Sequence, residues 1–143
     1  MYARELGPEV DVERLTGGAA RSLAPRELAR LFAVLAHPDR IRICEELRDA
    51  ERDVNSLQAV LGVTHARVSQ QLALLRTARV VGERRQGRHV FYRLIQPELA
   101  RWIARGLDFV EAELADSQAI RGAVAEARNL WLPSEAAAGA RGK

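Results

Sequence analysis

The stretch from Thr64 to Val81 begins with a segment whose apolar residues recur at helical spacing and whose polar side chains lie along one side. Val68, Leu72 and Leu75 form the apolar side, so the polar residues share the opposite face of the predicted helix. Glutamine bonds adenine through its amide, arginine bonds guanine or phosphate, and small polar groups reach bases or backbone from a helix N-terminus. The side chains that fit this chemistry are Thr64, His65, Arg67, Ser69 and Gln70.

A second group of polar residues follows on two β-rich runs, residues 80–85 and 88–95, which the turn Gln86-Gly87 joins. They predict a hairpin with a basic tip, where guanidinium groups reach phosphates or a narrow minor groove. Neighbouring strand residues point to opposite faces, so the basic side chains here cannot all contact one partner. We select Arg85, Arg88 and His89 as contacts and leave out Arg84; the alternative is a charged hairpin exposed to solvent.

The positive charge is concentrated in the same part of the chain. The formal net charge is only +3, but residues 64–95 hold seven arginines and one acid, Glu83. That segment therefore carries +6 and the rest of the chain −3. Charge segregation of this kind is typical of nucleic-acid binding, whereas an evenly spread +3 would indicate nothing.

Length and composition set the limits. The chain has 143 residues, which suits one domain, and one cysteine, Cys44, which excludes an intrachain disulfide and a thiolate zinc finger within one chain. The start lacks the apolar core of a signal peptide, and no stretch of about 18 uncharged apolar residues occurs. We expect a cytoplasmic protein that neither crosses nor binds a membrane.

The elements that position these residues are predicted as follows. Residues 1–24 form an N-terminal arm, and Pro25 is the first residue of a helix with an apolar stripe. Pro38 begins a second helix, with His37 as a turn or capping residue. Asn55 caps a short third helix that ends at Gly62, and Thr64 caps the next helix, which gives way to an extended segment at Val80-Val81. The last two helices and their glycine turn have the order and spacing of a helix-turn-helix.

The C-terminal part is helical from Pro97 onward, with a pattern that continues to residue 131. Asp116-Ser117 either breaks this helix or lies within it. The apolar face of the helix that starts at Pro97 is wide for the edge of a domain. Together with the apolar stripe of the first helix, it leads us to expect that a second copy of the chain covers these faces. The predicted dimer interface comprises Leu28, Leu31, Phe32, Trp102, Ile103, Gly106 and Val110.

The predicted fold class is mainly α, or α+β: a winged helix-turn-helix with a two-stranded hairpin as wing, dimerising through its N- and C-terminal helices. The DNA-binding domain spans residues 25–115, a helical extension spans 116–132, and residues 133–143 form a disordered tail.

Three segments together resemble the ArsR-type winged-helix repressors of bacteria. They are residues 35–43 (Leu-Ala-His-Pro-Asp-Arg-Ile-Arg-Ile), residues 61–76 and residues 87–94, in the family's order. The resemblance covers residues 27 to about 114. It implies homodimers that bind operator DNA near their own promoters and release it when an inducer binds.

The inducer sites of that family are not reproduced here. Its metal sensors carry Cys-x-Cys where this chain has Asp53 and Asn55, and its other metal site uses Asp and His on the last helix, which here lacks histidine. Persulfide-sensing members pair two cysteines, and Cys44 matches only the first. We therefore predict no metal and no cofactor, and interpret Cys44 as a buried hydrophobe rather than a redox sensor. Three alternatives remain for the inducer: a small apolar ligand near Phe32, Trp102 and Phe109, a partner protein, or no inducer at all.

The predicted function is a sequence-specific transcriptional regulator, a homodimeric repressor that binds double-stranded DNA at an inverted-repeat operator. One alternative is a winged helix that docks on protein, against which the basic segment argues. Another is a MarR-type regulator with a small-molecule inducer, against which the short turn at Gln86-Gly87 argues. An enzyme is not expected, because the chain shows no nucleophile with its base and no glycine-rich phosphate loop.

Overall fold

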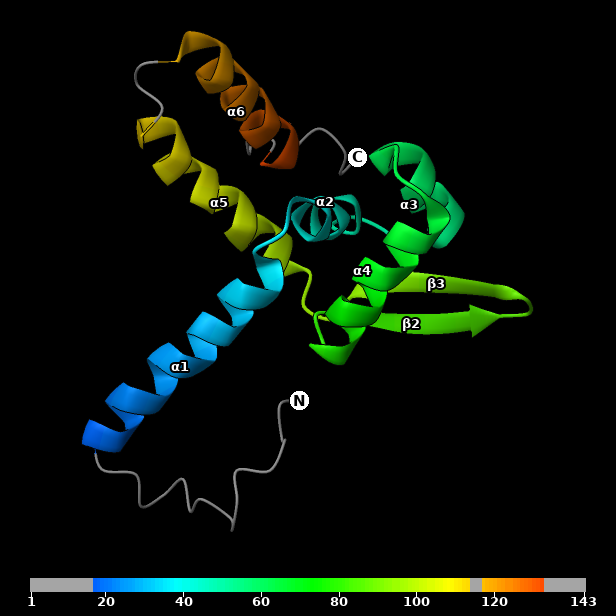
Figure 1. Cartoon of the computed structure of the whole chain (residues 1–143), viewed down its shortest axis with the longest axis horizontal. Coiled ribbons are helices and arrows are strands. Elements are labelled where there is room, and N and C mark those ends of the chain that lie inside the picture. The colour runs from blue at the N-terminus through cyan, green and yellow to red at the C-terminus, as the bar shows by residue number, and fades with distance from the viewer. Residues whose placement is uncertain (1–16, 114–116, 133–143) are drawn as a thin grey trace, which may run out of the picture.

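The structure is a computed structural model that describes residues 17–113 and 117–132. Figure 1 shows the β2–β3 hairpin at one edge of the molecule, next to α4 and projecting away from the helical body. In chain order the elements are α1 (Gly17–Leu35), α2 (Pro38–Glu46), β1 (Arg52–Asp53), α3 (Val54–Leu61), α4 (His65–Thr77), β2 (Val81–Gln86), β3 (His89–Leu94), α5 (Glu98–Glu113) and α6 (Gln118–Trp131).

Helix α1 begins earlier than the sequence predicted. Pro25 was expected as its first residue, but the helix starts at Gly17 and Pro25 lies inside it. A proline removes one backbone hydrogen bond and clashes with the preceding turn, yet it does not always end a helix, and the alanine-rich sequence before it favours helix. Residues 17–24 are therefore helical, not part of an arm. The remainder of the predicted arm, 1–16, and the predicted tail, 133–143, lie outside the described residues.

The sheet has three antiparallel strands in the order β1-β3-β2. The expected hairpin is present, with Val81 opposite Leu94 and Gln86 opposite His89. Its two-residue turn is Gly87-Arg88 and not Gln86-Gly87, and Gly87 adopts a positive φ of 60° that favours glycine. Strand β1 was not predicted, because two residues are too short to show alternation.

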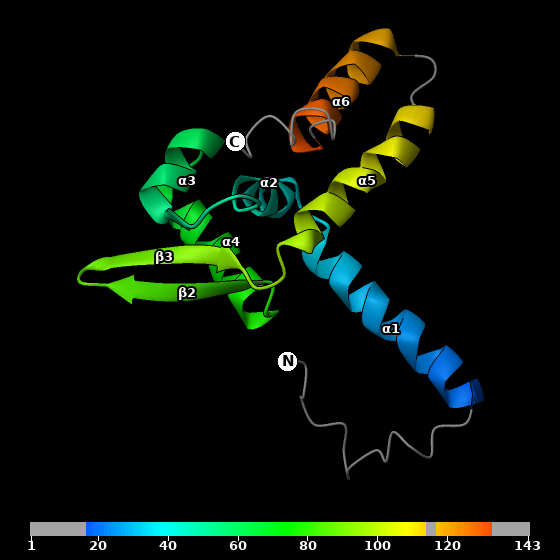
Figure 2. The same ribbon diagram turned by 180° about the vertical axis from the view of Figure 1, so that it is seen from behind.

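The hydrophobic core lies where α2, α3 and α4 meet the base of the hairpin. Helices α3 and α4 form the helix-turn-helix, and α2 packs on both of them. Figure 2 shows the same arrangement from behind, with α2 between the α3–α4 pair and α5. The fully buried side chains at the centre are Ile43, Cys44, Leu57, Val68, Leu72, Leu75 and Val81.

The C-terminal segment folds back as a separate helix. Helix α5 ends at Glu113, and Ser117 has an extended backbone before α6, so the helical pattern is interrupted at Ser117; Asp116 lies outside the described residues. The two helices lie side by side in both views (Figures 1 and 2). Arg128 of α6 pairs with Asp108 at 3.2 Å and with Glu111 at 2.6 Å on α5.

Helix α4 supplies a matched pair of leucines that tests this packing. Leu72 is 1% exposed and Leu74 is 49% exposed. Leu72→Ala removes a core side chain and leaves a cavity, so we expect it to lower the free energy of unfolding by about 2–5 kcal/mol. Leu74→Ala is the control and should cost less than about 1 kcal/mol. Urea unfolding followed by circular dichroism measures both; similar losses from the two variants would contradict this core.

Candidate functional site

The turn between α3 and α4 is fixed by local capping. Gly62 ends α3 in the left-handed conformation, with φ 69°, and its N–H donates to the Gln58 carbonyl. The Thr64 hydroxyl accepts from the backbone N–H of Arg67 at 3.2 Å and so begins α4, as predicted. Helix α3 is capped by Asp53, not by the expected Asn55. The Asp53 carboxylate accepts from Ser56 N–H at 2.8 Å, and this hydrogen bond lowers the pKa of Asp53.

The structure brings the predicted residues of α4 onto one accessible surface. Thr64, His65, Arg67 and Gln70 are exposed, and Ser69 is partly exposed. Val68 and Gln71 are buried, and Arg67 lies at the edge of the exposed face next to Gln71. The polar face therefore points outward, while the apolar face packs on the core.

The hairpin carries its basic residues on two faces. Cross-strand pairing places Arg84 with Phe91 and Gln86 with His89 on one face, and Arg85 with Val90 on the other. Arg85, Arg88 and His89 are all exposed. The register therefore separates Arg85 from His89, although sequence reasoning grouped them.

Arg84 is committed to contacts within the chain. Its guanidinium donates to the Glu51 carboxylate at 2.7 and 3.0 Å and lies 5.0 Å from the centre of the Phe91 ring. The hydrogen bond from Arg84 lowers the pKa of Glu51, and the same bond raises the pKa of Arg84. These contacts tie β2 to the loop before β1.

The beginning of α2 holds α4 through contacts that sequence reasoning missed. His37 caps α2, accepting from Asp39 N–H at its Nδ1, as its position before Pro38 predicted. Asp39 is buried and accepts from Arg67 Nε at 2.5 Å. The next residue, Arg40, donates to the Gln71 side-chain oxygen at 2.9 Å and to the Val34 carbonyl. Proline and aspartate signalled a helix start, but no local pattern indicates pairing across 28 residues.

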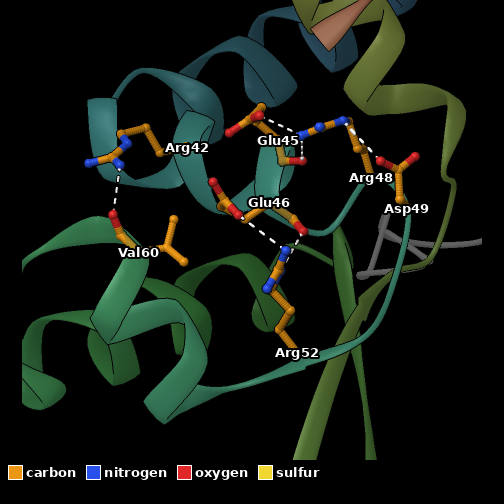
Figure 3. Close-up of polar contacts among 7 residues, drawn as sticks. All are labelled: Arg42, Glu45, Glu46, Arg48, Asp49, Arg52 and Val60. Carbon is orange, nitrogen blue, oxygen red and sulfur yellow. Dashed lines mark hydrogen bonds and ion pairs between the residues drawn. The ribbon is translucent and has the colours of Figure 1, made fainter. Parts of the chain in front are cut away.

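The rest of α2 continues these polar contacts (Figure 3). Arg42 donates to the carbonyls of Val60 at 3.0 Å and Leu61 at 3.1 Å, where the C-terminal end of α3 favours a cation. The Glu46 carboxylate forms an ion pair with Arg52 of β1, and Arg48 forms ion pairs with Glu45 and Asp49. Burial raises the pKa of Glu45, and the neighbouring Glu46 raises it further. Helix α2 is thus joined to α3, α4 and β1 by charged side chains.

Cys44 lies inside the core, as expected, with no exposed surface. Burial raises the pKa of its thiol from 9.0 to about 12. Within the described residues, no three His, Cys, Asp or Glu side chains come together as a metal site would require. No helix in the described part of the chain is long and apolar enough to cross a membrane.

The faces predicted to dimerise remain open in the single chain. Phe32 of α1 and Trp102 of α5 stack with ring centres 5.7 Å apart, and each is about half exposed. Beside them lies a groove of about 460 Å³. Its lining is almost wholly apolar and includes Leu35, Ile41, Ile103, Gly106 and Phe109. Of the predicted interface residues, Phe32, Trp102, Ile103 and Gly106 line this groove. Leu28 and Val110 are exposed on the same two helices, whereas Leu31 packs against the core.

Comparison with known proteins identifies the family. The model of the bacterial regulatory proteins of the arsR family matches residues 37–82. An uncharacterized HTH-type transcriptional regulator of Mycobacterium tuberculosis is 38% identical over 93 residues, which cover 64% of this chain and 82% of that protein. Its crystal structure has a TM-score of 0.58 at 36% identity, covering 66% of this chain and 95% of that one. The chain belongs to the ArsR family.

Two other solved structures support the same conclusion. The transcriptional repressor BigR of Xylella fastidiosa is 28% identical, with a TM-score of 0.56, over 68% of this chain and 97% of that one. A homodimeric winged helix-turn-helix domain from Mycobacterium bovis is 25% identical, with a TM-score of 0.57, over 73% of this chain and 95% of that one. This member of the ArsR family therefore has the predicted winged helix-turn-helix fold and is a transcriptional regulator, not an enzyme.

The burial of Cys44 has a measurable consequence. With a pKa of about 12, the thiol is almost wholly protonated at pH 8, and its sulfur has no access to solvent. We expect iodoacetamide to label the folded protein at least about a hundredfold more slowly than the protein unfolded in urea. Mass spectrometry of quenched samples measures this, and equal labelling rates would mean that Cys44 is reactive in the folded state.

The same group predicts how stability depends on pH. The unfolded chain releases the Cys44 proton near pH 9.0 and the folded chain keeps it until about pH 12. Between these two values the folded state binds more protons than the unfolded state. The contribution of Cys44 to the free energy of unfolding is therefore complete below pH 9.0 and decreases as the pH rises from 9.0 toward 12. Cys44→Ala is the control and should lack this part of the decrease.

Proposed function

We propose that this ArsR-family regulator is a homodimeric repressor that reads an inverted-repeat operator with the outward face of α4. The observation that carries the proposal is the exposed polar face of α4 beside a basic hairpin. A helix of this kind in a helix-turn-helix enters the major groove, with residues of its N-terminal half at the base edges. Relatives named as repressors, among them BigR, support the direction of regulation.

Within α4, Gln70 is the side chain best suited to reading a base. It is exposed on the second turn, and its amide offers a donor and an acceptor to the edge of adenine. Thr64, His65 and Ser69 lie nearer the helix N-terminus, where hydroxyl and imidazole groups reach phosphates or base edges. The backbone N–H groups of the first turn add a favourable site for a phosphate.

The hairpin supplies the phosphate contacts. Arg88 lies in the turn at the tip, and Arg85 and His89 lie on opposite faces of the strands just behind it. In the described part of the chain no carboxylate pairs with Arg85 or Arg88, in contrast to Arg84 with Glu51 and Arg76 with Glu83. Their charge is thus available for DNA, where cations that replace counterions add to affinity.

The dimer forms through the apolar surface of α1 and α5. Leu28, Phe32, Trp102 and Val110 are exposed large apolar side chains on these helices, and Gly106 leaves room for close approach. A monomer seldom leaves a continuous apolar patch in water, because covering it is favourable. The homodimeric relative from Mycobacterium bovis supports a two-fold assembly. Two copies place two α4 helices on one side of the DNA, which calls for an inverted repeat.

Reading and anchoring are separable in binding experiments. Gln70→Ala should weaken binding to a site selected by the protein by about 1–3 kcal/mol and hardly change binding to random DNA. Arg88→Ala should weaken both and reduce the salt slope by about one, because it removes one phosphate contact. Fluorescence anisotropy with labelled duplexes at several salt concentrations measures both effects. Equal losses from Gln70→Ala on the two DNAs would exclude base reading, and binding insensitive to salt would favour a protein-docking module instead.

The dimer is tested at the Phe32–Trp102 stack. Phe32→Ala removes an aromatic side chain from the centre of the proposed interface, so the dissociation constant of the dimer should rise by about tenfold or more. Leu130→Ala on α6, also an exposed apolar residue, is the control and should leave dimerisation unchanged. Sedimentation equilibrium measures both. Footprinting should show two protected half-sites about 34 Å apart, and a monomeric parent protein or a single protected half-site would contradict the proposal.

A further inference from the structure

Two consecutive residues at the start of α2 hold two residues of α4 that lie one turn apart. Asp39 receives Arg67 Nε at 2.5 Å, and Arg40 Nη1 donates to Gln71 Oε1 at 2.9 Å. Residues four apart on a helix share one side of it, so both contacts act on the same side of α4. Two attachment points along a helix fix its rotation about its own axis as well as its position.

This rotation decides which side chains α4 presents outward. Gln71 is buried, whereas its neighbour Gln70 is exposed. If α4 rotated about its axis by the angle between successive residues, a different set of side chains would face outward. Apolar contacts through Val68 and Leu72 tolerate small rotations, because dispersion and hydrophobic burial are not directional. The hydrogen-bonded pairs are directional and require one angle.

The Asp39–Arg67 pair is well placed to persist. The Asp39 side chain is only 10% exposed, whereas that of Arg67 is 52% exposed. A buried carboxylate without its partner is unfavourable, so the charge of Asp39 keeps Arg67 directed toward α2. An arginine in this position of α4 could otherwise extend to any nearby phosphate, whatever the base sequence.

We propose that Asp39 and Arg67 form a specificity clamp: Arg67 acts as a positioning residue that fixes α4 for base reading, and does not itself contact bases or phosphates. The proposal rests on the function proposed above. If Asp39 is neutralised, Arg67 is released beside the DNA and α4 loses one attachment. Discrimination between sequences should then fall, while affinity for random DNA should stay the same or rise.

The experiment uses the full chain and a duplex that the parent protein selects from a random pool, with a shuffled duplex of the same composition as reference. The variants are Asp39→Asn and Arg67→Gln. Asp49→Asn is the matched control, because Asp49 is an exposed acid beyond the other end of α2 and pairs only with Arg48 in the described part of the chain. All four proteins are measured at several salt concentrations and below their melting temperatures. If Asp39→Asn does not fold, Arg67→Gln alone provides the test. That variant keeps Asp39 in the first turn of α2, where a negative charge is favourable, so we expect it to fold.

The expected result is that both variants lower the ratio of selected to shuffled affinity by about tenfold, while Asp49→Asn leaves it unchanged. Arg67→Gln should leave the salt slope of the parent unchanged. A slope reduced by about one would identify Arg67 as a phosphate contact and overturn the clamp. The clamp is also overturned if Asp39→Asn keeps the parent's ratio of selected to shuffled affinity. If Asp39→Asn does not fold, the same result for Arg67→Gln overturns it. If the parent selects no sequence at all, the proposed function fails together with the clamp.

Discussion

The arrangement of the helix-turn-helix depends on one constraint, the need of the buried Asp39 carboxylate for a partner. The backbone N–H of Asp39 donates to the His37 side chain, and the Asp39 carboxylate accepts a hydrogen bond from Arg67 of α4. A charge removed from water without such a partner would be strongly unfavourable, so α2 and α4 cannot separate or rotate freely. Arg40 extends the constraint to Gln71 and to the end of α1, and Arg42 extends it to the last carbonyls of α3. The short helix α2 is thereby the element on which the others are oriented.

Ion pairing within the chain separates some arginines of residues 64–95 from those at the hairpin tip. Arg67, Arg76 and Arg84 form ion pairs within the chain, and two of their partners, Asp39 and Glu51, lie outside residues 64–95. Counting charge along the sequence therefore overstates the charge offered to a partner. What remains at the hairpin tip, on Arg85 and Arg88, is positioned by the contacts of Arg84, since those contacts hold β2 against the loop before β1. The paired arginines orient the surface, and the hairpin arginines give it charge.

Local signals in the sequence were enough to predict most of the fold. Pro38, Gly62 and Thr64 each set a helix end through their own backbone or side chain, and the structure has those ends where the residues indicated. Sequence reasoning failed where the cause was not local. The pairs Asp39–Arg67 and Arg84–Glu51 join residues far apart in the chain, and β1 exists only because Arg52 and Asp53 lie opposite Tyr92 and Phe91. At Pro25 the failure was different: the proline was taken as a helix start although the residues before it also favour helix.

Helix α6 packs on α5 without closing the apolar surface that α1 and α5 share. The compared structures cover nearly all of their own length but at most about three quarters of this chain, so the chain exceeds the shared fold. At 3.6 residues per turn, Asp108 and Glu111 lie on the side of α5 opposite to Trp102 and Gly106. Arg128 binds the former pair, which holds α6 on that side. The Phe32–Trp102 surface is left uncovered by α6 as a result, so α5 holds α6 on one side and leaves the other side free for the second copy proposed above.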